Sequence, residues 1–337
     1  MIQQLEKIAK KIDKARDSFE VTVSYDIPTE IAFKNQKYPI YVYSIGSQKP
    51  SAPVLFITGG VHGLEKIGAQ LAWSLLKTTL DKLQWDQSLQ YVFNSVRLVI
   101  VPLVNPVGYF HQMRSNGNGV DLMRNAPIIA TTKTPFLIGG QTFSKKLPWY
   151  QGAGQQLEIE NLVLKEAFLK ETKKSKCVIS IDFHSGFGMK DRIWFPYSYK
   201  PEPFDDLPEM YSLITLFENS HPYHIYQIEP QSKSYMMNGD MWDYLFSKFK
   251  ESNPNATYIP LTLEMGSWIW VKKNPLQLFT PGGVFNPIKE HRLKRTYRRH
   301  HLFFDFLLKA LLSNEVWSFQ NFPLREKNKK LAMAKWY

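Results

Sequence analysis

Short apolar runs alternate with amphipathic stretches along most of the chain. The runs at residues 54–58, 96–104 and 177–183 are rich in aliphatic and aromatic residues, which is typical of strands that are buried in a sheet. Apolar residues recur at helical spacing over residues 64–80 and 157–172. Because strands that alternate with helices favour a layered sheet, this pattern predicts an α/β fold.

The two ends of the chain add further elements. Apolar residues at helical spacing predict a helix over residues 2–12, and β-branched and aromatic residues predict short strands over residues 19–25 and 40–43. A long helix with one apolar face is predicted over residues 291–312. The remaining predicted elements are strands over residues 223–228 and 258–264 and a short helix or turn region over residues 239–249.

One domain is the simplest organisation for this pattern. No internal repeat, low-complexity tract or clear linker interrupts residues 1–337. We expect residues 1–50 to supply an N-terminal helix and short strands that pack on the domain, and residues 286–313 to supply its C-terminal helix. Residues 105–154 form a long irregular section that is rich in Gly, Asn, Pro and Thr. Irregular stretches of that length inside a domain usually serve a function.

The chain is basic, with 42 Lys and Arg against 30 Asp and Glu and a net charge of +12. Such a balance suits an anionic partner, but solubility alone explains it more simply. The densely basic stretch at residues 289–299 lies in a helical pattern, and no known nucleic-acid-binding motif accompanies it. We therefore expect no nucleic-acid partner.

The single cysteine, Cys177, lies in an apolar run and cannot form an internal disulfide. This cysteine usage suits a reducing compartment. The N-terminus has no apolar signal core, and no apolar run approaches the ~18 residues that a membrane span needs. These features predict a cytoplasmic protein with no membrane partner.

A glycine-rich turn carries the first candidate site. Gly59 and Gly60 follow the apolar run at residues 54–58, and His62 and Glu65 come just before the next helical pattern. Sites in open α/β sheets form at the carboxyl ends of strands, where such turns lie. A His and a Glu three residues apart can bind one metal ion together, but H-x-x-E alone is a weak signal because it occurs by chance in many chains.

His184 and Glu264 are two further residues that can bind a metal ion or exchange a proton. Each comes at the end of an apolar run that is predicted to be a strand. Converging strand ends would bring both to His62 and Glu65, and His₂Glu with a water molecule is a known catalytic zinc set. In such a site the metal lowers the pKa of the water, and Glu264 would take its proton and pass it to the leaving amine. A cationic donor would also be needed for the oxyanion that develops.

Six short motifs occur in one order between residues 54 and 268. They are H-x-x-E (62–65), N-P-x-G (105–108), R-x-N (114–116), G-V-D-L-x-R-N (119–125), His-Ser (184–185) and Thr-x-Glu (262–264). Each is weak alone, but together and in this order the chain resembles the zinc carboxypeptidase family, the carboxypeptidase A-like metallopeptidases. Carboxypeptidase A is itself a known His₂Glu zinc enzyme. The resemblance implies a mixed, largely parallel sheet with helices on both faces.

The resemblance also implies a role for each matched residue. Glu264 is similar to the family's general base, and Arg114 is similar to the arginine that polarises the scissile carbonyl and stabilises the oxyanion. Asp121 is similar to the carboxylate that orients the first zinc histidine. The implied zinc ligands are His62, Glu65 and His184, and the implied substrate-binding residues are Arg124 for the terminal carboxylate, Asn116, Ser185 and the Tyr244 of a W-x-Y segment.

Two positions depart from the family pattern. Met123 stands where the family usually has Asn before the carboxylate-binding arginine, and Leu64 stands where it often has Arg in the first metal turn. Both changes remove hydrogen-bond donors to the substrate. We therefore expect an enzyme with a non-standard substrate rather than an inactive one.

These residues predict a zinc-dependent hydrolase of amide bonds, namely a cytoplasmic metallocarboxypeptidase with one zinc ion per chain and a peptide or small amide substrate. A zinc acylase similar to the aspartoacylase and succinylglutamate desuccinylase group is an alternative, because that group shares H-x-x-E, a later His and a Glu base. Met123 favours the acylase, whereas the long spacing from N-P-x-G to G-V-D-L-x-R-N favours the peptidase. A third hypothesis is a non-catalytic protein that binds an anionic polymer through its basic face.

Overall fold

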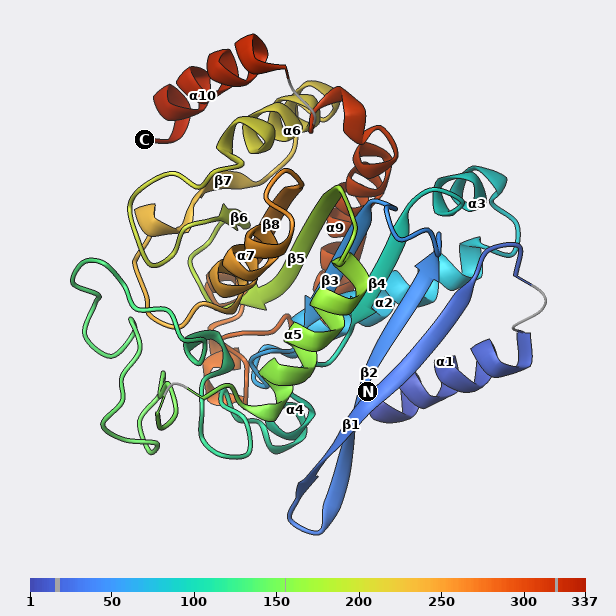
Figure 1. Ribbon diagram of the computed structural model, residues 1–337. Coiled ribbons are helices and arrows are strands. Elements are labelled where there is room, and N and C mark those ends of the chain that lie inside the picture. Colours follow the sequence, from blue (N-terminus) through green and yellow to red (C-terminus); the bar gives the residue numbers. More distant parts are fainter. Residues whose placement is uncertain (16–18, 155, 319–320) are drawn as a thin grey trace.

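An eight-stranded sheet runs through the centre of the molecule (Figure 1). The structure, a computed structural model, describes residues 1–15, 19–154, 156–318 and 321–337. The strands are β1 (Val23–Phe33), β2 (Gln36–Gly46), β3 (Val54–Gly59), β4 (Arg97–Val101), β5 (Cys177–Ser185), β6 (Arg192–Phe195), β7 (Gln227–Pro230) and β8 (Thr257–Met265).

The middle of the sheet is parallel, and antiparallel pairs lie on both sides of it. From one edge to the other, the strand order is β1-β2-β4-β3-β5-β8-β6-β7. β3 is parallel to both β4 and β5, and β5 is parallel to β8. β2 pairs with β4, and β6 pairs with β8, in antiparallel orientation. At the edges, β1 is antiparallel to β2, and β7 is parallel to β6. This topology confirms the predicted mixed, largely parallel sheet.

Helices cover both faces of the sheet (Figure 1). α2 (Lys66–Lys82) and α9 (Glu290–Leu312) contact each other, and both contact β3 and β5. On the opposite face, α5 (Ile159–Thr172) contacts β3, and α7 (Met241–Ser252) contacts β8. The other helices are α1 (Ile2–Ala15), α3 (Gln87–Phe93), α4 (Pro106–His111), α6 (Leu207–Ser220), α8 (Trp268–Lys273) and α10 (Phe322–Trp336), with the short helices η2 (Leu122–Arg124), η3 (Gln231–Lys233), η4 (Pro275–Phe279) and η5 (Asn314–Val316).

The central strands are buried because apolar side chains point to both of their faces. Val54, Leu55, Phe56 and Ile57 of β3 are all fully buried, and each such side chain stabilises the fold by roughly 1.5–3 kcal/mol. Cys177 at the start of β5 is also fully buried, as its apolar surroundings in the sequence predict. Burial raises the pKa of the Cys177 thiol to about 12. This cysteine therefore stays a protonated, unreactive thiol near neutral pH.

Several elements were not predicted from the sequence because their patterns are short or weak. β6 has only 4 residues, and α4 begins inside the section that was predicted to be irregular. α4 starts there because the Asn105 side chain accepts a hydrogen bond from the Gly108 amide and Pro106 occupies the first turn. β1 begins at Val23, later than predicted, and both β1 and β2 are longer than the predicted strands. The other helices that the pattern missed are α3, α6, α8 and α10.

His300 is a buried histidine on α9, outside the candidate site, and only 3% of its surface is exposed. Its Nδ1 lies 2.9 Å from the Tyr226 hydroxyl oxygen, while its Nε2 has no hydrogen-bond partner among the described residues. Burial lowers the pKa of His300 to about 4, although the nearby Asp191 opposes this effect. The folded protein therefore holds His300 neutral near neutral pH.

We predict that His300 makes the folded state less stable as the pH falls from about 6.5 to about 4. In the unfolded chain this histidine binds a proton near its ordinary pKa of about 6.5, so acid favours the unfolded state over this interval. Between about pH 7.5 and about pH 5, the effect on the free energy of unfolding reaches up to about 2 kcal/mol.

Urea unfolding of the wild type and His300→Asn at these two pH values measures the effect. The variant should lose less stability on acidification than the wild type, by up to about 2 kcal/mol. Equal losses in the two proteins would contradict the prediction, because the shared effect of all other titrating groups cancels in the comparison.

Candidate active site

The turn after β3 positions the first two candidate ligands. Gly60 has a φ of +66°, a conformation that favours glycine. Gly63 lies against α4, where an added Cβ would be 2.0 Å from the carbonyl carbon of Gly108. Glu65 is the N-cap residue of α2, but its side chain makes no capping hydrogen bond. The Glu65 carboxylate is therefore free to face the candidate site beside His62.

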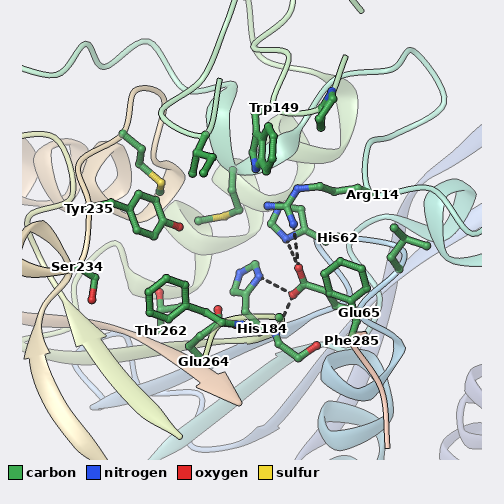
Figure 2. Close-up of a pocket in the computed structure, with 18 of the residues that line it drawn as sticks. His62, Glu65, Arg114, Trp149, His184, Ser234, Tyr235, Thr262, Glu264 and Phe285 are labelled. Carbon is green, nitrogen blue, oxygen red and sulfur yellow. Dashed lines mark hydrogen bonds and ion pairs between the residues drawn. The ribbon is translucent and has the colours of Figure 1, made fainter. Parts of the chain in front are cut away.

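The Glu65 carboxylate lies between two imidazole rings (Figure 2). Its Oε1 is 2.8 Å from Nδ1 of His62, and its Oε2 is 3.1 Å from Nδ1 of His184. The three residues are buried, and each offers a ligand atom within 4.8 Å of the other two. The fold thus brings together the three side chains that were predicted as zinc ligands, although His184 comes from a different strand.

A carboxylate on the far side of each imidazole ring holds that ring in place. Nε2 of His62 lies 3.0 Å from Oδ1 of Asp121, and Nε2 of His184 lies 2.7 Å from Oδ2 of Asp182. Both rings present Nδ1 toward Glu65, and a bound metal ion would take the Nδ1 lone pair of each ring while Nε2 keeps its proton toward the carboxylate. Asp121 therefore has the position that suits its implied orienting role.

Asp182 was missed in the sequence, although it contacts His184 as closely as Asp121 contacts His62. Its Oδ1 accepts a hydrogen bond from the Thr58 hydroxyl at 2.7 Å, and its Oδ2 accepts one from the Trp242 indole at 3.0 Å. Residues two apart on a strand share one face of the sheet. The Asp-x-His spacing at the end of a buried strand was therefore a signal that the sequence contained.

Glu264 reaches the same place from the neighbouring strand. In the parallel pairing of β5 and β8, Glu264 is the register partner of His184. Its Oε1 accepts a hydrogen bond from the Phe187 backbone amide at 3.0 Å, which fixes the carboxylate. Burial and the nearby Glu65 raise the pKa of Glu264 to about 8. A buried, fixed carboxylate of this kind can exchange a proton with a water molecule.

The donor set suits a divalent cation. Burial would raise the pKa of Glu65, but His62 and His184 hold it well below its ordinary value, so the carboxylate is ionised. Two imidazole nitrogens and one carboxylate form a zinc-binding set that leaves a fourth position open for water or substrate. The residues present therefore fit a catalytic zinc ion, which would be held by these three side chains.

Arg114 places a positive charge beside the candidate ligands (Figure 2). Its Nε donates to Asp121 Oδ2 at 2.9 Å, and its Nη1 donates to Glu65 Oε1 at 3.2 Å. Burial would lower the pKa of Arg114, but Asp121 and Glu65 raise it above its ordinary value. The guanidinium is therefore always charged, and it borders the cavity, where it can stabilise an oxyanion.

A cavity of about 730 Å³ opens over these residues (Figure 2). The candidate ligands, Arg114 and Glu264 line one part of it. Much of the remaining wall is aromatic, and such walls favour apolar groups of a ligand. The aromatic lining residues are Trp149, Phe187, Trp194, Tyr235, Trp268 and Phe285.

Two of the predicted substrate-binding residues, Arg124 and Ser185, border the cavity. The Arg124 guanidinium donates to the carbonyl oxygens of Ile138 and Met123 at 3.0 and 3.2 Å, which fixes it at the wall. Ser185 is buried, and among the described residues its hydroxyl has no hydrogen-bond partner. Met123 and Leu64 also line the cavity, so both departures from the family pattern put apolar groups where a substrate would lie.

Asn116 and Tyr244 are not among the described residues that line the cavity. The Asn116 amide is buried and donates to the Glu158 and Glu160 carboxylates, so it ties the loop to the start of α5. Tyr244 packs against the hydrophobic core from α7. The substrate contacts of both residues therefore stay predictions. Tyr235 is a tyrosine that does border the cavity.

A His₂Glu set at the ends of parallel strands, with a buried carboxylate facing the same cavity, is the arrangement of zinc hydrolases. The comparison with known families agrees with this class. The chain belongs to the zinc carboxypeptidase family, whose model matches residues 33–267. This range includes all three candidate ligands and Glu264.

The chain is similar to curated carboxypeptidases over parts of its length. It is 25% identical to carboxypeptidase D of Drosophila melanogaster over 244 residues, which are 66% of this chain and 16% of that protein. It is also 25% identical to carboxypeptidase A2 of Mus musculus over 197 residues, which are 53% of this chain and 43% of that protein. The chain therefore spans less than half the length of these relatives.

Solved structures show the same fold. Thrombin-activatable fibrinolysis inhibitor matches with a TM-score of 0.66 and 19% identity, over 92% of this chain and 74% of that chain. Carboxypeptidase A from Helicoverpa armigera matches with a TM-score of 0.66 and 17% identity, over 92% of this chain and 72% of that chain. At these identities the likeness concerns the fold alone.

We predict that Asp182→Asn weakens zinc binding by about 10- to 100-fold, because it removes the charge that orients His184. Competition with a chelator of known affinity measures the change. Asp243→Asn is a matched control, since Asp243 is a buried carboxylate that accepts hydrogen bonds from Ser198 and contacts none of the candidate ligands in the described structure. Equal zinc affinities for the wild type and Asp182→Asn would show that Asp182 is not needed for orientation.

Proposed function

We propose that this protein is a zinc metallocarboxypeptidase that binds one zinc ion per chain and hydrolyses a peptide or other amide bond. The observation that carries the proposal is the placement of Glu264. Its carboxylate faces the cavity beside His62, Glu65 and His184 and is fixed by the Phe187 amide. A merely structural metal site would not require a further carboxylate in the cavity beside its ligands.

In the proposed reaction the chain's own residues bind, orient and move protons. When bound, zinc would supply a Lewis acid for the substrate carbonyl and an acidified water molecule. In its ionised form, Glu264 removes a proton from the water that attacks the carbonyl carbon and delivers it to the leaving amine as the C–N bond breaks. Arg114 stabilises the negative charge that develops on the carbonyl oxygen.

The substrate binds across the aromatic part of the cavity. Arg124 is fixed at the wall and pairs with a carboxylate of the substrate. Leu64 and Met123 supply no further donors to that carboxylate, so its recognition depends on Arg124 more than the family pattern implies. Because the other lining residues include six aromatic side chains, we expect substrates with an apolar terminal residue to react best.

The comparisons support the peptidase more than the zinc acylase. The family model that matches is that of zinc carboxypeptidases, whereas Met123 is the one residue that favours the acylase. The non-catalytic hypothesis is also weaker, because a protein without activity has no need for Glu264 beside a complete ligand set.

The test is Glu264→Gln with a peptide that ends in a free, apolar residue. We predict that kcat falls by about 10²- to 10⁴-fold, because the general base is lost. The zinc content should stay at the wild-type value, since Glu264 is not a ligand. Glu202→Gln, a change at an exposed carboxylate, serves as the control and should keep full activity. Full turnover by Glu264→Gln, or loss of its zinc, would count against the assignment.

A further inference from the structure

Two segments of the chain border the mouth of the cavity. Rim loop 1 is residues 126–154, and rim loop 2 is residues 265–289. Ile138 of the first and Trp268 of the second each line the cavity and also belong to the exposed apolar residues. Figure 1 shows rim loop 1, in green, extending away from the sheet near the carboxyl end of β5. Both loops therefore flank the opening through which a substrate enters.

Both loops expose large apolar side chains to an unusual degree. In rim loop 1, Phe136 is 82% exposed and Phe143 is 61% exposed, and their rings stack on each other at 6.4 Å. In rim loop 2, Leu276 is 74% exposed and Phe279 is 86% exposed. Single exposed apolar residues are ordinary, but several of them on the two segments that border one cavity indicate an interaction site.

In both loops, the charged side chains are all positive. Neither loop contains an Asp or a Glu, although the chain has 30 acidic residues. Each loop carries three exposed lysines, and among the described residues none of the six has an ion-pair partner. These lysines are Lys133, Lys145 and Lys146 in rim loop 1 and Lys272, Lys273 and Lys289 in rim loop 2.

Contrary to the expectation from the sequence that there is no membrane partner, we propose that the two rim loops dock this protein on an anionic membrane surface. Protruding aromatic side chains insert at the boundary between lipid headgroups and acyl chains, while neighbouring lysines pair with headgroup phosphates. Phe136, Phe143 and Phe279 are not among the described residues that line the cavity, so their exposed rings are available to a surface outside it. None of the described helices qualifies as a membrane span.

This docking would turn the mouth of the cavity toward the bilayer. Substrates that reach the site would then be held at, or released near, the lipid surface. The inference does not rest on the proposed hydrolysis, because vesicle binding is measured without turnover.

The experiment is co-sedimentation of the full chain with vesicles of phosphatidylcholine alone or with about one third phosphatidylglycerol. We expect binding at least about 10-fold tighter to the anionic vesicles, and weaker binding as added salt screens the lysines. The double variant Phe136→Ser/Phe279→Ser should bind at least about 10-fold more weakly than the wild type. Lys145→Glu/Lys146→Glu should also bind more weakly, chiefly at low salt.

Tyr223→Ser is the matched control, because Tyr223 is 95% exposed but lies outside both rim loops. It should bind vesicles as the wild type does, and thermal unfolding of each variant checks that its fold is intact. Three results would overturn the proposal. They are no binding to anionic vesicles at low salt, binding that the Phe variants leave unchanged, and a dimer in solution that dissociates when Phe136 and Phe279 are replaced.

Discussion

The contact of the Glu65 carboxylate with two imidazole rings is the interaction on which the site depends. Its oxygens lie 2.8 and 3.1 Å from the Nδ1 atoms of His62 and His184, which are far apart in the sequence. The parallel pairing of β3 and β5 makes this meeting possible, because it sets Gly59 opposite Phe183 and so brings both strand ends to one edge. A shift of one residue in this pairing would turn His184 to the other face of the sheet.

The charged side chains around the site can be buried because each has a partner of opposite charge or a hydrogen-bond donor. A carboxylate buried without a partner is costly, yet Asp121 and Asp182 are both almost fully buried. Each is compensated by an imidazole Nε2, and Asp121 also by Arg114. The carboxylates fix the rings, and the rings in turn lower the pKa of Glu65. The result is a preorganised donor set that suits a divalent cation.

The sequence was enough to predict what lies at strand ends. Apolar runs located β3, β5 and β8, and the residues that follow or end them proved to meet in space. Asn116 and Tyr244 were predicted from short motifs alone, and such motifs do not reveal which way a side chain points. Tyr235 and the rim loops were missed because their residues come together only through the folded path of irregular segments. A scan for long apolar runs also overlooks exposed apolar residues that are dispersed among lysines.

The decisive measurement for the metal centre is the zinc content of the purified protein beside that of His184→Ala. We expect about one zinc ion per chain in the wild type and its loss in the variant, because two remaining ligands hold zinc poorly. Thermal unfolding would confirm that the variant is folded. No zinc in the wild type after reconstitution, or equal zinc in the two proteins, would contradict the assignment of this site as a zinc centre.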